Sequence, residues 1–107
     1  MIGTLPWPVI HEEVIDAICR YLVDEYNGFY GFVSIPRLTE YVYTHPHRNL
    51  QPHLYNKEWD VVRARISKTI KDLKWEKFSR NVYMVPVEMR ARVERRKVMI
   101  KGRRAVV

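Results

Sequence analysis

The stretch Lys57–Lys74, KEWDVVRARISKTIKDLK, decides the fold, because its apolar residues recur at one helical spacing. The 3-4-4-3 spacing of these residues places them on one face of an α-helix: Trp59, Val62, Ile66, Ile70 and Leu73. Charged and polar residues occupy the other sides: Asp60, Arg63, Arg65, Ser67, Lys68, Lys71 and Lys74. The stretch therefore predicts an amphipathic helix with an apolar inner side and a basic outer side.

The residues before this stretch predict two further helices. Apolar residues recur at helical spacing from about Val9 to Tyr26, and Asn27-Gly28 ends that pattern. The segment 32–35 is expected to be extended, with Ser34 capping a second helix that ends at His45-Pro46. Residues 44–56 form a long polar loop, and the third helix is expected to begin at Asn56 or Lys57.

After the third helix, the spacing of the apolar residues is no longer helical. A β-hairpin is predicted from residues 75–78, a turn at 79–81 and residues 82–86, because aromatic and β-branched residues favour strands. Beyond Glu88 the chain is strongly basic, and Met89, Val93 and Val98 indicate a weak helix. For residues 101–107, the sequence leaves a strand and a disordered arm both open.

The order helix, short strand, helix, helix, hairpin resembles the winged-helix family. Two patterns carry the resemblance: Val33–Val42, VSIPRLTEYV, and Val62–Leu73, VRARISKTIKDL, followed by Lys74-Trp75. The resemblance implies an α+β fold with a three-helix winged helix-turn-helix core in residues 1–89, a small β-hairpin wing and a basic C-terminal extension in residues 90–107. Two features depart from the family pattern: the link between the second and third helices is long, and the turn of the wing is short.

Positive charge is concentrated in the second half of the chain. The net charge of +7 divides into −3 for residues 1–56, +3 for residues 57–89 and +7 for residues 90–107. Such asymmetry favours a polyanionic partner, although a solvated basic domain with a disordered tail is the alternative. Cys19 is the only cysteine, and neither a signal peptide nor a membrane span is evident, so a cytoplasmic protein is expected.

The resemblance implies sequence-specific binding of double-stranded DNA by a transcriptional regulator, with helix 57–74 in the major groove. Arg63 is the expected base reader, because a guanidinium contacts guanine O6 and N7 together. The expected contacts of the helix and wing are Asn56, Lys57, Asp60, Arg63, Ala64, Ser67, Lys68, Lys71, Lys77 and Arg80. In the tail, Arg90, Arg92, Arg95 and Arg96 are expected to add affinity without sequence preference, so deletion of residues 90–107 should lower every affinity.

Three alternatives remain open at this stage. The basic residues of helix 57–74 are also compatible with ordinary solvation of an amphipathic helix. A winged-helix module that binds protein within a transcription or replication complex, or an RNA-binding factor, fits the same sequence. The family resemblance also implies a homodimer, with the first helix or the C-terminal tail as the expected contact surface.

Catalytic and metal-binding patterns are not evident. His45, His47 and His53 lie in one loop, but Cys19 falls in an apolar stripe and does not complete a zinc site. We find no phosphate loop, dinucleotide fingerprint or nucleophile with a base partner, so we expect neither an enzyme nor a cofactor or small-molecule ligand. Trp59 and Trp75 fall on apolar positions and are assigned to the core.

Overall fold

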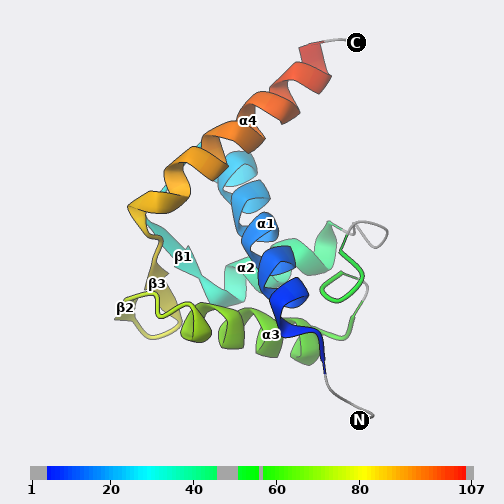
Figure 1. Ribbon diagram of the computed structural model, residues 1–107, viewed down its shortest axis with the longest axis vertical. Coiled ribbons are helices and arrows are strands. Elements are labelled where there is room, and N and C mark those ends of the chain that lie inside the picture. Colours follow the sequence, from blue (N-terminus) through cyan, green and yellow to red (C-terminus); the bar gives the residue numbers. More distant parts are fainter. Residues whose placement is uncertain (1–4, 46–50, 56, 106–107) are drawn as a thin grey trace.

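The computed structural model describes residues 5–45, 51–55 and 57–105, and side chains up to residue 99. In this part of the chain, four α-helices and a three-stranded antiparallel sheet form an α+β fold (Figure 1). The elements are α1 (Trp7–Tyr26), β1 (Phe32–Ser34), α2 (Ile35–Thr44), α3 (Trp59–Asp72), β2 (Lys77–Ser79), β3 (Val82–Met84), a short 3-10 turn η1 (Val87–Met89) and α4 (Arg90–Ala105).

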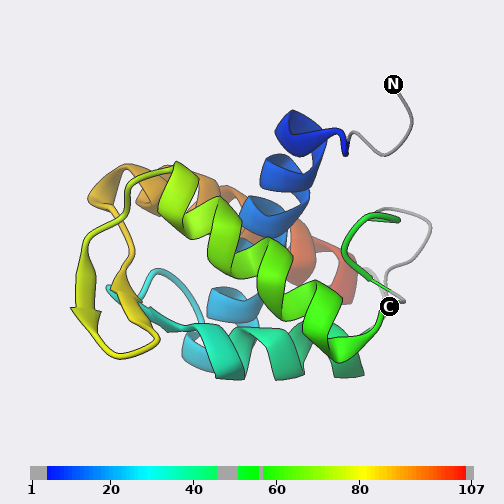
Figure 2. The same ribbon diagram turned by 90° about the horizontal axis from the view of Figure 1, so that it is seen from below.

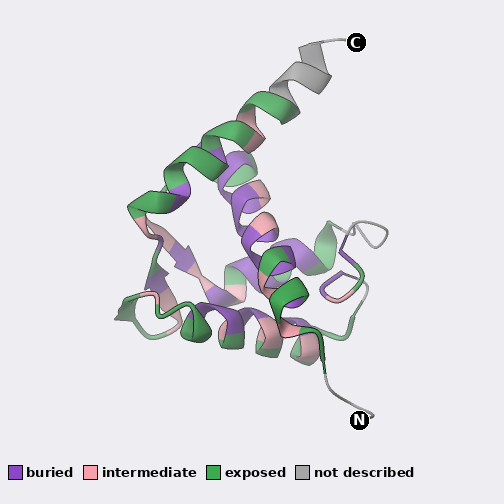
Figure 3. Cartoon of the chain, in the orientation of Figure 1, coloured by how far each residue is buried: buried purple, intermediate pink, exposed green. Residues whose placement is uncertain are grey.

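Helix α1 is the central element, and α2, α3 and α4 all pack against it. It begins at Trp7, two residues before the predicted start, with proline in its first turn. Asn27 ends the helix in the left-handed conformation, with φ of 59°, and its backbone N–H donates to Val23 O at 2.9 Å. Half of the residues of the helix are buried, and they are the purple parts of its ribbon in Figure 3.

The start of α2 follows the predicted capping pattern. The Ser34 hydroxyl accepts a hydrogen bond from the backbone N–H of Arg37 at 3.4 Å, and Pro36 lies in the first turn. One turn later, the Thr39 hydroxyl donates to Ile35 O at 2.7 Å. The helix ends at Thr44, directly before the predicted stop at His45-Pro46. The predicted second helix is therefore confirmed.

Strand β3 lies in the middle of the sheet, between β1 and β2. The hairpin turn between β2 and β3 contains Asn81 with φ of 63°, a left-handed conformation that asparagine tolerates well. Val33 of β1 pairs with Tyr83 of β3, and both side chains are buried. Since side chains alternate along strands, the neighbouring pair of Phe32 and Met84 lies on the opposite, solvent side of the sheet.

The segment 51–55 is part of the core, contrary to the expectation of a wholly polar loop. Leu54 and Tyr55 are fully buried, and Gln51 is nearly so. The backbone N–H of His53 donates to the Glu13 carboxylate at 3.0 Å. The second half of the loop is thus fixed on α1, while residues 46–50 and Asn56 lie outside the described residues.

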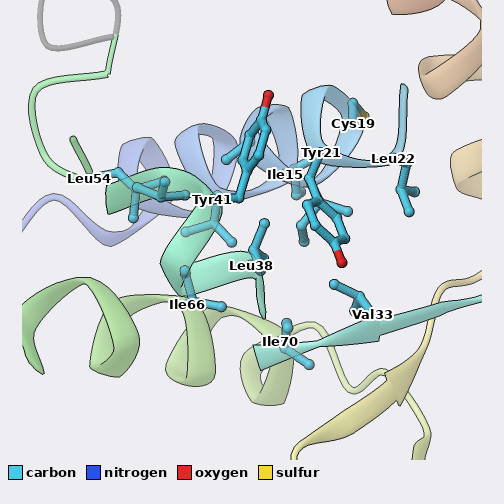
Figure 4. Packing of buried hydrophobic residues seen from close by; sticks show 14 of the residues in the cluster. Ile15, Cys19, Tyr21, Leu22, Val33, Leu38, Tyr41, Leu54, Ile66 and Ile70 are labelled. Carbon is cyan, nitrogen blue, oxygen red and sulfur yellow. The ribbon is translucent and has the colours of Figure 1, made fainter. Parts of the chain in front are cut away.

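The core collects the apolar faces of all three predicted helices and the inner side of the sheet (Figure 4). Val62, Ile66 and Ile70 of α3 are fully buried, but the two ends of the predicted stripe are not. Trp59 is 36% exposed, so its assignment to the core was wrong, and Leu73 at the other end of the stripe is 37% exposed. Trp75 is partly buried against the core, which agrees with the prediction.

The residues after the sheet form a helix, so neither a strand nor a disordered arm, the alternatives left open by the sequence, is correct for residues 101–105. Helix α4 extends to Ala105, so residues 101–105 are helical. Val93 is fully buried and Met89 is 7% exposed, and both belong to the same core as α1. Arg90–Met99 is therefore docked on the domain and is not a separate arm.

Candidate nucleic-acid interface

The outer side of α3 faces away from the core. The helix packs against α2 and α1 through its buried stripe, and Figure 2 shows it running across the near face of the molecule. Asp60, Ala64 and Lys71 on the outer side are exposed, and Arg63 and Ser67 at its edge are half-buried. Lys57, just before the helix, is exposed as well. The outer side predicted from periodicity is therefore accessible to a partner.

The positive charge on this side is not neutralised by the rest of the described chain. Lys57, Arg63 and Lys71 form no ion pair with any described residue. Asp60 is the acidic residue on the same side. A partner with several negative charges would find the exposed ammonium groups of Lys57 and Lys71 and the half-buried guanidinium of Arg63 here.

Lys68 differs from its neighbours, because it joins α3 to the beginning of α1. Its ammonium lies 3.0 Å from the Asp72 carboxylate and 4.9 Å from the centre of the Trp7 ring. Asp72 also lies 3.1 Å from Nε2 of His11, and the hydrogen bond from Lys68 is the main cause that lowers the pKa of Asp72. These contacts hold Lys68 at one edge of the outer side.

Arg65 lies on the inner flank of α3 and has a structural contact. Its guanidinium donates to the backbone oxygen of His53. His53 in turn binds the buried Glu13, whose pKa is raised above its usual value by burial. The basic side predicted from the sequence is therefore divided: Arg65 fixes the segment 51–55, and the outer residues remain available.

The hairpin extends the basic surface beyond the end of α3. Lys77 in β2 and Arg80 in the turn are exposed, and neither forms an ion pair with a described residue. Lys74 lies in the connection between α3 and β2 and adopts a positive φ of 60°. It was placed on the basic side of the helix but not among the candidate contacts. In the sequence, Lys74 stands between the end of the helix and the following strand, and this order is the signal that it lies beside the hairpin.

The predicted contacts on α4 lie apart from those on α3. Figures 1 and 2 show α4 and α3 on opposite sides of α1. Arg92 forms an ion pair with Glu12 at 2.7 Å, and Arg96 pairs with Asp16. Arg90 lies over the Phe29 ring, 4.7 Å from its centre, and Arg95 is exposed. The structure thus divides the predicted basic residues into two separate groups.

The ion pairs of α4 explain why two of its arginines are not simply solvated. Asp16 lies between Arg96 and Arg20, whose Nε donates to the carboxylate at 3.0 Å. The amide of Gln51 also donates to Asp16. Acidic residues of the first half of the chain therefore neutralise part of the basic C-terminal segment, and they fasten α4 to α1.

The described part of the chain shows neither a metal cluster nor a reactive cysteine. Within it, no three His, Cys, Asp or Glu side chains are grouped so that they could hold a metal ion. Burial raises the pKa of the Cys19 thiol to about 11, so it is not a reactive thiolate near neutral pH. None of the described helices is long and apolar enough to cross a membrane.

Comparison with known proteins gives no relative for this chain: no protein family, curated protein or solved structure matches it.

Proposed function

We propose that the chain is a winged-helix protein that binds double-stranded DNA through α3. The element order α1-β1-α2-α3-β2-β3 and the strand order β1-β3-β2 support the winged-helix assignment. In this arrangement, α2 and α3 form the helix-turn-helix and the β2-β3 hairpin forms the wing. The connection 45–58 between α2 and α3 is long for the motif, and its residues 51–55 fill the space between α1 and α3.

The observation that carries the proposal is the outer side of α3, which is uncovered and basic. A helix enters the major groove with its exposed side toward base edges. Arg63 and Ser67 are assigned to base contacts, and Lys57 and Lys71 to phosphates. Lys77 and Arg80 on the wing are assigned to the backbone beside the groove. Site-specific binding of this kind is what a transcriptional regulator requires.

The roles assigned to α4 change with its position. Because α4 lies across α1 from α3, its arginines are not assigned to a duplex held by α3. Arg92 and Arg96 are assigned to fastening α4 on α1 through their ion pairs. The proposal therefore places the main interface on α3 and the hairpin, and it no longer depends on the basic C-terminal segment.

The test is selection of bound duplexes from a random pool, followed by titration of the selected and unrelated duplexes. Arg63→Ala should reduce the preference for the selected sequence by about 1–3 kcal/mol and leave affinity for unrelated DNA largely unchanged. Lys71→Ala should lower both affinities together, and Arg95→Ala on the opposite side serves as the matched control. Equal losses for all three variants, or stronger binding to structured RNA at the same salt concentration, would contradict the proposal.

A further inference from the structure

The first two turns of α3 present short side chains in the middle of the outer side. Asp60 and Ala64 lie one turn apart on the helix, and both are exposed. The longer basic side chains lie to either side of them, because helical spacing places Arg63 at one border of the outer side and Lys68 at the other. The middle of the helix is therefore lower than its borders.

This profile brings the two short side chains toward the floor of a major groove. When a helix enters the groove, its middle faces the base edges and its borders lie beside the phosphates. The N-terminal residues of a recognition helix are the ones that contact bases, and Asp60 belongs to the first turn of α3. Under the proposed function, Asp60 is thus placed against a base edge.

The carboxylate of Asp60 is not neutralised within the described part of the chain. It forms no ion pair there, although Arg63 lies only three residues later on the same helix. Asp72, near the other end of α3, differs in this respect, because it pairs with both Lys68 and His11. Of the two aspartates of α3, Asp72 is used within the fold and Asp60 is left for a partner.

A carboxylate at this position opposes the non-specific part of DNA binding. It repels the phosphates that the neighbouring lysines attract, so it lowers the affinity for every duplex. A favourable contact of Asp60 with DNA must therefore be made to a base. In the major groove, cytosine presents the N4 amino group as a donor, whereas guanine and thymine present acceptors, and adenine has the N7 acceptor beside its amino group.

We infer that Asp60 selects a cytosine in the duplex that α3 binds, an inference that rests on the proposed function. The carboxylate accepts a hydrogen bond from N4 of that cytosine. It rejects guanine and thymine, because their acceptor atoms face another acceptor, and it disfavours adenine through N7. Arg63, one turn further along α3, is assigned to guanine, so acidic and basic side chains of the same helix read different bases.

A purely structural role for Asp60 makes a different prediction. An acidic side chain in the first turn of a helix is stabilised by the positive end of the helix dipole. Glu58, at the N-cap of α3, makes no capping hydrogen bond through its side chain, so Asp60 is the acidic residue inside the first turn. In this role, the loss of the carboxylate changes the stability of the protein and leaves its base preference unchanged.

The test is selection of bound duplexes from a random pool, with the full wild-type chain and with Asp60→Asn. The wild type should select a cytosine that Asp60→Asn disfavours by about tenfold relative to wild type. The variant should prefer adenine at that position, because an amide both donates to N7 and accepts from N6. Glu58→Gln is the matched control: it removes a negative charge two residues earlier and should leave every base preference unchanged.

The outcomes separate this inference from the DNA-binding proposal. If the wild type selects a sequence and Asp60→Asn selects the same one, the inference is wrong and the DNA-binding proposal stands. Urea denaturation then shows whether the carboxylate serves the end of the helix, through a lower free energy of unfolding in Asp60→Asn. A change of the same preferred base in Glu58→Gln also overturns the inference, since it assigns the effect to net charge. A wild-type chain that binds no duplex overturns both.

Discussion

Two buried threonines show how differently a hydroxyl behaves within one core. Thr39 and Thr69 are both fully buried. The hydroxyl of Thr39 donates to Ile35 O at 2.7 Å, one turn earlier in α2. The hydroxyl of Thr69 in α3 has no hydrogen-bond partner among the described residues. Because an unpaired buried hydroxyl is penalised by lost hydration, the two residues should respond in opposite ways to the same substitution.

Replacement of Thr69 by valine should stabilise the protein. Valine has nearly the same shape and removes the unpaired hydroxyl, so we expect Thr69→Val to raise the free energy of unfolding by about 1 kcal/mol. Thr39→Val is the matched control and should lower it by about 1 kcal/mol, since it removes a hydrogen bond that is made. Urea denaturation measures both changes. A lower free energy of unfolding in Thr69→Val would show that the Thr69 hydroxyl of the wild-type protein has a hydrogen-bond partner.

Glu13 should make stability depend on pH. Burial raises its pKa, so the folded protein disfavours the carboxylate relative to the unfolded chain. The favourable contribution of Glu13 to the free energy of unfolding is fully present below its pKa in the unfolded chain. It is lost as the pH rises through its raised pKa in the folded protein. Glu13→Gln should therefore be more stable than wild type at about pH 7, and this advantage should shrink toward about pH 4. Glu76→Gln on the surface is the control for denaturation at both pH values.

The sequence predicted which residues α3 presents to solvent better than it predicted what they touch. Helical spacing identified Arg63, Ser67 and Lys71 on the outer side, where the structure places them. The same spacing could not show that Lys68 contacts Trp7, because that contact joins residues distant in the chain. Trp59 was misassigned for a related reason. At the first turn of α3 its ring packs edge-on against Tyr43 at the surface instead of entering the core.

At the scale of elements, prediction succeeded where local signals are strong. The cap at Ser34 and the stop at Asn27 are local chemistry, so α1 and α2 were predicted within two residues at their ends. The segment 51–55 was not predicted, because its burial depends on Glu13 and Arg65 from two other elements. A loop that becomes core through tertiary contacts has no periodic signal in the sequence.

Helix α4 is the clearest example of an element fixed by tertiary contacts. Val93 is the one fully buried side chain among the described residues of the helix, so its apolar pattern is weak. The helix also contacts the domain through the ion pairs of Arg92 with Glu12 and of Arg96 with Asp16 and through Arg90 over the Phe29 ring. The sequence shows eight basic residues from Arg90 onward, but it cannot show which of them have acidic partners. Deletion of the segment would therefore expose α1 as well as remove charge.

Shortening the buried side chain of α4 should destabilise the whole domain. Val93→Ala removes two methyl groups from a fully buried site, so we expect a loss of about 2 kcal/mol in the free energy of unfolding. Val98→Ala, at a position that is 70% exposed, should change stability by no more than about 0.5 kcal/mol. Chemical denaturation measures both. Equal effects would mean that α4 is not docked through Val93.

For the molecule as a whole, the fold determines which of the charged residues counted in the sequence are available to a partner. The acidic first half and the basic second half of the sequence are not two separate surfaces, because α4 lies on α1. Arg92 and Arg96 are paired there, so fewer cations remain for a polyanion than the number of basic residues suggests. Several of the described cations that form no ion pair lie on α3 and the hairpin, although Arg37 of α2 and Arg95 of α4 form none either. The proposed interface uses those on the face formed by α3 and the hairpin.

The number of phosphate contacts on that face can be counted from the salt dependence of DNA binding. Each neutralised phosphate contributes about −0.9 to the slope of log affinity against log salt concentration. Lys71→Ala and Arg80→Ala should each make the slope shallower by about 0.9, and the double variant by about twice that amount. Arg95→Ala should leave the slope unchanged, because α4 faces away from α3. Titrations of one unrelated duplex at several salt concentrations provide the measurement. If Arg95→Ala changes the slope and Lys71→Ala does not, the duplex lies on α4, and the assignment of α3 as the major-groove helix fails.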